Sequence, residues 1–253
     1  MKKLGNAGWL AAIGCGLLAL AYAAIGGGKD LVHWVAGREM LVENLGAAAF
    51  LATALIYLAM ARREREAPRP RRLLLLGLGL FFLLAGGEEA SWGQHWLGFE
   101  TPDELKELNA QQETNLHNLW VIDSYAADAG KTKGFEKKTG MAALLLNSNR
   151  LFDLLMIGFF WLLPAAAARP NPLRGLLRRW SVPVPAWPFA ALLLANFFGT
   201  LLAELFLVDG AFRHLAVSEV REFGYAMLGL LAAIELWRRP ALSFSSGIPI
   251  LEP

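Results

Sequence analysis

The sequence predicts an all-α protein, an integral membrane helical bundle of about six transmembrane helices with short amphipathic helices on its outer surface. Of the 253 residues, 55% are hydrophobic and only 18% are charged, and the mean hydropathy is +0.39. The charges cluster, and the apolar stretches between the clusters run for about 20 residues, the length that a helix needs to cross the hydrocarbon. Because a spanning segment must satisfy its own backbone hydrogen bonds, each stretch is expected to be a helix.

Six apolar stretches have this length, and loops rich in charge or proline separate them. The predicted spans are residues 7–26, 40–61, 73–92, 150–168, 184–208 and 221–237. Pro68 and Pro70 end the second span, because proline breaks the interior of a helix. We therefore expect residues 1–253 to form a single membrane-embedded domain.

The first apolar stretch has two interpretations. Ala21-Tyr22-Ala23 resembles the small-residue cleavage site of a signal peptide, in which case residues 1–26 would be removed. The stretch is long and many spans follow it, so a retained first span is the preferred interpretation.

The basic residues predict the orientation of the bundle. More than half of the 24 lysines and arginines fall near the N-terminus, in the loops 62–72 and 169–180, and after the last span. Lysine and arginine are enriched in short cytoplasmic loops, so both termini are predicted to be cytoplasmic. Tryptophans mark the two boundaries as an aromatic belt would, with Trp34, Trp92, Trp96 and Trp120 outside and Trp180, Trp187 and Trp237 inside.

The long polar stretch 91–140 then becomes an extracytoplasmic helical insertion between spans three and four. Thr101, Pro102 and Glu104 have the pattern of a helix start, with a cap, a proline in the first position and a capping-box acid. A second short helix is expected over residues 112–127, where Glu113 and His117 would share one face. An amphipathic cover with solvated polar residues is the simpler interpretation of both helices.

Ionisable residues at the outer end of the third span are the candidate catalytic groups. Adjacent carboxylates beside phenylalanines and leucines are costly in a span unless they are paired, protonated or facing water, and such residues are functional candidates. A carboxyl group in apolar surroundings can act as a general acid or base. The predicted catalytic residues are Glu88, Glu89, Ser91 and Gln94.

All four histidines fall outside the spans or at their outer ends, which suggests a metal site on that side. Imidazole and carboxylate groups are common ligands of zinc and other divalent metals, which lower the pKa of bound water. No HExxH motif is present, so the ligands would come from separate segments. The predicted metal ligands are His95, Glu113, His117 and His214, and the cofactor is left open, with zinc as one candidate.

Other classes of protein find little support in the sequence. The single cysteine, Cys15, excludes an intrachain disulfide and says nothing about redox compartment. No basic patch with interleaved aromatic residues indicates a nucleic-acid partner, and no internal repeat indicates an inverted-repeat transporter. The predicted partner is membrane lipid, and protein partners are not predicted.

Three short strings resemble the signature of a group of uncharacterised bacterial multi-pass membrane proteins. The strings are GEEASWGQ at residues 87–94, ETP at residues 100–102 and NLHNL at residues 115–119, and REMLVENL at residues 38–45 is similar more loosely. The resemblance covers most of residues 38–120. It implies a multi-pass protein of the bacterial inner membrane and no particular activity.

Two characterised families offer weaker analogies. The CAAX-protease-like enzymes carry a paired glutamate at a span end, as at Glu88 and Glu89, but this chain lacks the arginine that follows their pair and lacks their Phe-x-x-x-His motif. The alkaline-ceramidase-like hydrolases use serine, aspartate and three histidines around zinc, and the paired histidine near their last span is not matched here.

The sequence leaves two alternative functions open. The first is a metal-assisted hydrolase or transferase acting on a lipid or lipid-linked substrate at the outer face. The second is a non-catalytic membrane scaffold or envelope-assembly partner, in which the outer polar residues hold helices together. Transport is disfavoured, because the inner halves of the spans are almost wholly apolar.

Overall fold

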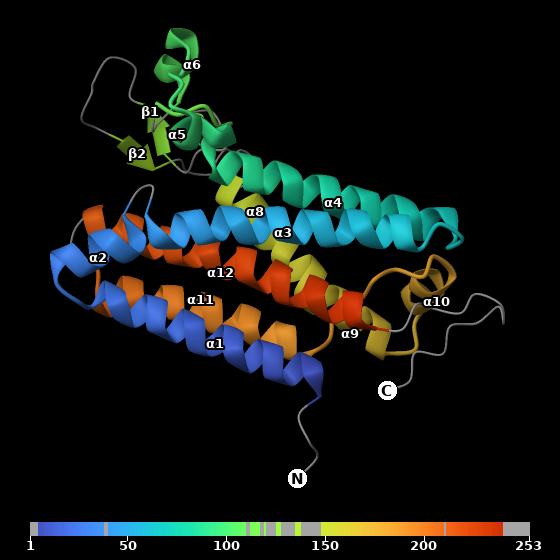
Figure 1. Cartoon of the computed structure of the whole chain (residues 1–253). Helices are drawn as coiled ribbons and strands as arrows, with labels where there is room; N and C mark the ends of the chain where they lie inside the picture. Colours follow the sequence, from blue (N-terminus) through green and yellow to red (C-terminus); the bar gives the residue numbers. More distant parts are fainter. Residues whose placement is uncertain are drawn as a thin grey trace. The chain divides into compact units, whose positions relative to one another are not determined.

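The computed structural model describes residues 5–37, 40–109, 112–116, 119, 125–127, 135–137, 148–209 and 211–239 (Figure 1). The chain divides into two compact units, one of residues 1–86 with 158–253 and one of residues 87–157, and each is described by itself. The predicted all-α helical bundle is confirmed.

Helices build the first unit. In chain order it contains α1 (Asn6–Ile25), α2 (Lys29–Ala36), α3 (Leu41–Arg63), most of α4 (Arg69–Glu89), the π-helical turn η2 (Gly158–Leu162), α9 (Leu163–Ala168), α10 (Pro172–Arg179), α11 (Pro188–Phe206) and α12 (Ala211–Arg238). Helix α12 is central, because it packs against α1, α3 and α11 (Figure 1). Its inward residues, such as Val217, Tyr225 and Ala232, are buried.

Small residues and aromatic rings bring these helices together. A Cβ atom on Gly79 of α4 would lie 2.7 Å from the side chain of Leu58 on α3, so only glycine allows this approach. Phe82 of α4 stacks on Tyr57 of α3, with 5.8 Å between ring centroids. Dense packing of this kind holds helices together in lipid, where apolar surface gains little from helix association.

Five stretches of the described residues are long and apolar enough to cross a membrane, as a multi-pass membrane protein requires. They are Asn6–Ile25, Lys29–Arg63, Arg69–Glu89, Arg150–Ala168 and Pro188–Phe206, of which Lys29–Arg63 contains both α2 and α3 and runs over residues 38 and 39, which lie outside the described residues. Large apolar side chains remain exposed along them, among them Leu20, Leu55 and Leu205, which fits a lipid-facing surface. The sixth predicted span, residues 221–237, lies within α12, which carries more charge and is not among the five.

The second unit contains the end of α4, the 3₁₀ turn η1 (Ser91–Gly93), α5 (Gln94–Leu97), α6 (Asp103–Leu108), two short strands and α8 (Ser148–Ile157). The strands β1 (Tyr125–Ala127) and β2 (Phe135–Lys137) pair antiparallel. The helix expected from Thr101 and Pro102 is present as α6, but the predicted cap at Thr101 is wrong, because Pro102 is the N-cap residue and no side chain caps the helix.

The helix predicted over residues 112–127 is wrong for the residues described there. Residues 112–116 form turns, and residues 125–127 form β1. Gln112 has a positive φ of 61°, which no α-helix contains, and the side chain of Asn109 bonds the backbone at Glu113 and Asn115. Asparagine side chains compete with helical hydrogen bonds in this way.

Candidate functional site

The chain leaves α4 through a tight left-handed turn. Helix α4 ends at Glu89, three residues before the predicted end of the third span, and Ser91, Trp92 and Gly93 follow with φ of 43°, 55° and 81°. The left-handed region costs an ordinary residue roughly 1–2 kcal/mol, so Ser91 and Trp92 are strained. Strained backbone of this kind collects at functional sites. The turn also ends the helical register that would have placed Glu88 and His95 on one face.

The turn brings the hydroxyl of Ser91 onto the carboxylate of Glu113. Ser91 Oγ donates to Glu113 Oε2 at 2.7 Å, and both residues are buried. The amide of Asn115 donates to both groups, to Ser91 Oγ at 3.0 Å and to Glu113 Oε2 at 2.9 Å. We call Ser91, Asn109, Glu113 and Asn115 the serine network.

Asn109 holds the serine network in place from the end of α6. Its Nδ2 donates at 2.8 Å to both the backbone oxygen and Oδ1 of Asn115, and its Oδ1 accepts from the backbone N–H of Glu113 at 3.2 Å. Fixing Oδ1 of Asn115 as an acceptor leaves its Nδ2 aimed at Ser91 and Glu113. The two asparagines therefore orient the carboxylate and the hydroxyl together.

Further bonds join the segment after α4 to residues 112–116. Glu88 accepts from the indole Nε1 of Trp92 at 2.7 Å and from the backbone N–H of Leu116. Gln94 Oε1 accepts from the backbone N–H of Thr114 at 2.8 Å. The backbone N–H groups of Thr114 and Leu116 lie outside any helix and need acceptors, which Gln94 and Glu88 supply. Glu88 and Gln94 therefore position the serine network.

The serine network has the geometry of a nucleophile with a base. A hydroxyl, a carboxylate within hydrogen-bond reach and a third group that orients the carboxylate are the parts that activate a serine. A buried carboxylate can accept the proton of the serine hydroxyl when Oγ attacks, provided that the distance is about 2.6–3.2 Å. The 2.7 Å between Ser91 and Glu113 meets this condition.

The eight predicted site residues have different outcomes. The second unit brings Ser91 and Glu113 into direct contact, and Glu88 and Gln94 contact the same segment, residues 112–116. Glu89 is the last residue of α4 and is half-buried. His95 lies in α5, and its side chain is outside the described part of the chain, as is all of His117.

His214 belongs to the first unit, where it pairs with another residue of that unit. Its Nδ1 lies 2.8 Å from Glu204 Oε1, and both side chains are partly exposed. Glu113, the other predicted metal ligand with a described side chain, lies in the second unit. The four-ligand metal site therefore stays a prediction.

Sequence reasoning missed the two asparagines of the serine network. Asn115 stands at the start of the NLHNL string, so the motif contained it, but its role depends on a contact 24 residues back in the chain. Asn109 had no signal beyond its place after an expected helix. Asparagine is common in turns because its side chain hydrogen-bonds to nearby backbone groups. This propensity could have predicted turns at Asn109 and Asn115.

Comparison with protein-family models, with curated proteins and with solved structures finds no match for this chain. The contacts within each unit therefore carry the functional argument. The resemblance of residues 87–94 and 115–119 to a bacterial membrane family stays a prediction, although both strings contribute residues to the serine network.

Proposed function

We propose that this protein is a membrane-embedded hydrolase or transferase that acts on a lipid or lipid-linked substrate, with Ser91 as nucleophile and Glu113 as general base. The observation that supports it is the buried 2.7 Å hydrogen bond from Ser91 Oγ to Glu113 Oε2 in a strained turn directly after a candidate span. The proposed location is the bacterial inner membrane, with both termini cytoplasmic and residues 91–140 on the outer side.

The reaction would proceed in two balanced steps. Ser91 Oγ attacks an acyl carbonyl carbon while Glu113 takes the hydroxyl proton, and the proton then passes to the departing alkoxide, which leaves as an alcohol. Water or an acceptor hydroxyl then attacks the acyl-serine, Glu113 takes its proton, and Ser91 is released with that proton returned to Oγ. Water as acceptor makes the protein a hydrolase, and an alcohol makes it a transferase.

The surroundings of Ser91 support a lipid substrate. The residues that follow it expose aromatic and apolar side chains, with Trp96 58% and Leu97 77% exposed, and Trp92 and Phe99 also on the surface. Tryptophan at the end of a span is typical of the headgroup level of a bilayer. A substrate anchored by acyl chains would thus have its ester or headgroup at the depth where α4 ends.

Lipid analysis of whole membranes tests the proposal, because it surveys every lipid class at once and needs no chosen substrate. Cells expressing the full chain are compared with cells expressing Ser91→Ala, Glu113→Gln or the matched control Thr101→Val, which removes another buried hydroxyl of the same unit. The wild type and Thr101→Val should change one lipid pool, and the other two variants should match the empty vector. If Ser91→Ala, present at wild-type level, changes that pool as the wild type does, Ser91 is not the nucleophile.

A metal-assisted version of the proposal uses His95, Glu113, His117 and His214 and is tested separately. Metal analysis of purified wild type and His117→Ala measures the stoichiometry of bound zinc or another divalent ion. One ion per wild-type chain and a clear loss in the variant are expected for this version. Equal and substoichiometric metal in both proteins would reject it and leave the metal-free serine reaction.

A scaffold or envelope-assembly role is the second candidate, and one observation favours it. Ser91 is only 1% exposed, and the groups of the serine network bond one another. Such a network can serve simply to hold Asn109 and residues 112–116 against the turn after α4. The scaffold interpretation predicts that none of the lipid pools differs between wild type and Ser91→Ala.

A further inference from the structure

Helix α10 carries a second charged site that the serine network does not involve. It is a short amphipathic helix of the first unit, between α9 and α11, and it begins with Asn171 as a cap whose Oδ1 accepts from the backbone N–H of Arg174 at 2.8 Å. Leu177 is buried, whereas Leu173 and Leu176 on the same side are exposed. The helix therefore has apolar surface that the rest of the unit leaves uncovered.

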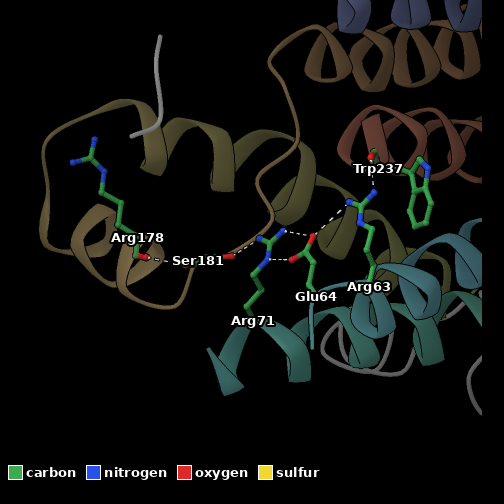
Figure 2. Close-up of polar contacts among 6 residues, drawn as sticks. All are labelled: Arg63, Glu64, Arg71, Arg178, Ser181 and Trp237. Atoms are coloured by element: carbon green, nitrogen blue, oxygen red, sulfur yellow. Dashed lines mark hydrogen bonds and ion pairs between the residues drawn. The ribbon is translucent and has the colours of Figure 1, made fainter. Parts of the chain in front are cut away.

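The segment that follows α10 is bonded to the first turn of α4. Arg71 Nη1 donates to the backbone oxygen of Ser181 at 2.6 Å, and the same guanidinium forms a buried ion pair with Glu64 (Figure 2). The backbone N–H of Val182 donates to the oxygen of Leu177 at 2.9 Å, which closes the turn after the helix. These contacts use backbone atoms at the end of α10, including the oxygen of Arg178, which accepts from the backbone N–H of Ser181 at 3.0 Å, and they do not use the guanidinium groups of α10.

Arg174 and Arg178 stand four residues apart on α10 and so share one side of the helix. The Nε atom of each is buried and meets no acceptor among the residues that the structure describes. Figure 2 shows the Arg178 guanidinium pointing away from the Arg71–Glu64 pair. Elsewhere at this end, Arg63 and Arg71 pair with Glu64, and Arg239 pairs with Glu235, whereas no ion pair of Arg174 or Arg178 is found within the described part of the chain.

The surface around α10 is strongly basic and has an aromatic anchor. The exposed arginines at this end of the unit are Arg62, Arg63, Arg65, Arg69, Arg72, Arg169, Arg179 and Arg238. The exposed acid among the described residues of these segments is Glu66. Trp180, directly after α10, is 42% exposed. An excess of arginine with tryptophan and leucine beside it complements a ligand that has a negative headgroup and apolar chains.

We propose that α10 binds the headgroup of an anionic phospholipid, whose phosphate accepts hydrogen bonds from Arg174 and Arg178. Guanidinium groups donate two parallel hydrogen bonds to phosphate oxygens, which satisfies donors that are otherwise unpaired. The acyl chains lie along Leu173 and Leu176, and Trp180 lies at headgroup level. This site is independent of the activity proposed for Ser91.

Lipid titration of the purified full chain, followed by native mass spectrometry, tests the site. Phosphatidylglycerol is compared with phosphatidylcholine, and wild type with Arg174→Gln/Arg178→Gln. An arginine near an anionic headgroup strengthens binding about 5-fold, so the double variant should lose about 30-fold in phosphatidylglycerol affinity. Arg65→Gln/Arg69→Gln removes the same charge from exposed positions of the same basic surface but outside α10, so it tests whether α10 itself holds the phosphate, and it should lose less than about 3-fold.

A second variant and a competitor complete the test. Arg174→Lys/Arg178→Lys keeps the charge but loses the paired hydrogen bonds, and it should bind phosphatidylglycerol with intermediate affinity. Inorganic phosphate at millimolar concentration should leave the bound lipid in place. Equal losses in the α10 and control pairs, equal binding of the two lipids, or displacement by inorganic phosphate would each overturn the proposal.

Discussion

The first and the second unit each bury a glutamate, and they stabilise it in opposite ways. Glu64 and Glu113 are both 5% exposed. Glu64 pairs with the guanidinium of Arg71, which stays protonated and moves no proton. Glu113 is bonded by the hydroxyl of Ser91 and the amide of Asn115, and the hydroxyl proton can be transferred. The first arrangement is a fixed anchor, and the second has the parts of a catalytic group.

Removing the cation of the anchor should have the largest effect on stability. In Arg71→Met the buried carboxylate of Glu64 loses both hydrogen bonds from Arg71 and keeps the longer contact with Arg63 at 3.6 Å, and the oxygen of Ser181 loses a donor, so the free energy of unfolding should fall by about 3 kcal/mol. Unfolding in mixed micelles by added denaturing detergent measures it. The double variant Glu64→Leu/Arg71→Met should recover most of the loss. If the double variant is no more stable than the single one, Glu64 is not the group left uncompensated.

Glu113→Gln should have a smaller effect, because the hydroxyl of Ser91 and the amide of Asn115 that bond its carboxylate are neutral groups. The variant weakens the hydrogen bonds from Ser91 and Asn115, which now reach a neutral acceptor, and it places the new side-chain amide beside the amide of Asn115. The free energy of unfolding should fall by about 2 kcal/mol. The same unfolding assay measures it. Glu104→Gln, an exposed acid on α6 of the same unit, is the matched control and should stay within about 0.5 kcal/mol of wild type. A loss as large as that of Arg71→Met would contradict the distinction between the two glutamates.

The strain at the turn after α4 can be separated from the hydrogen bond of Ser91. Ser91→Ala and Ser91→Gly both remove the hydroxyl, but glycine adopts the positive φ of 43° without a Cβ penalty. Ser91→Gly should therefore be about 1 kcal/mol more stable than Ser91→Ala, as measured by the same unfolding curves. Equal stabilities would mean that the left-handed backbone at this position stores no strain.

The exposed pair of His214 and Glu204 should contribute least. Glu204 lies at the C-terminal end of α11 and both side chains of the pair are partly exposed, so Glu204→Gln should cost less than about 1 kcal/mol. Thermal melting in detergent, with wild type as reference, is sensitive enough to detect a larger change. A loss above about 2 kcal/mol would show that His214 has a stronger role than this pair indicates.

Much of the fold could be predicted from the sequence because hydrophobic length decides it. Four of the six predicted spans, the first, third, fourth and fifth, coincide to within four residues at each end with stretches that can cross a membrane. The second, residues 40–61, matches α3 (Leu41–Arg63), which is part of such a stretch. Helical backbone bonds are local, so each span could be predicted without knowing its neighbours. The end of the third span was predicted three residues too late, since hydropathy does not register the positive φ values of Ser91 and Trp92.

The candidate site was predictable only in part. Glu88, Ser91 and Gln94 could be identified because these polar residues lie within seven positions of one another in the sequence. Glu113 was also predicted to belong to the site, but as a metal ligand. Its contact with Ser91 joins residues 22 positions apart through turns. Turn geometry set by asparagine side chains has no periodic signal, which is also why the helix over 112–127 was wrong.

Cysteine labelling across the membrane tests the central claim most directly. With Cys15 replaced by serine, single cysteines are placed at Glu66, in the basic loop before α4, and at Leu97, beyond the turn that carries Ser91; both positions are exposed. A membrane-impermeant maleimide is then applied to intact spheroplasts. Labelling of Leu97→Cys from outside, with labelling of Glu66→Cys only after lysis, is the expected result. Labelling of both from the same side would contradict a membrane-crossing α4 and the outer-face site proposed for Ser91.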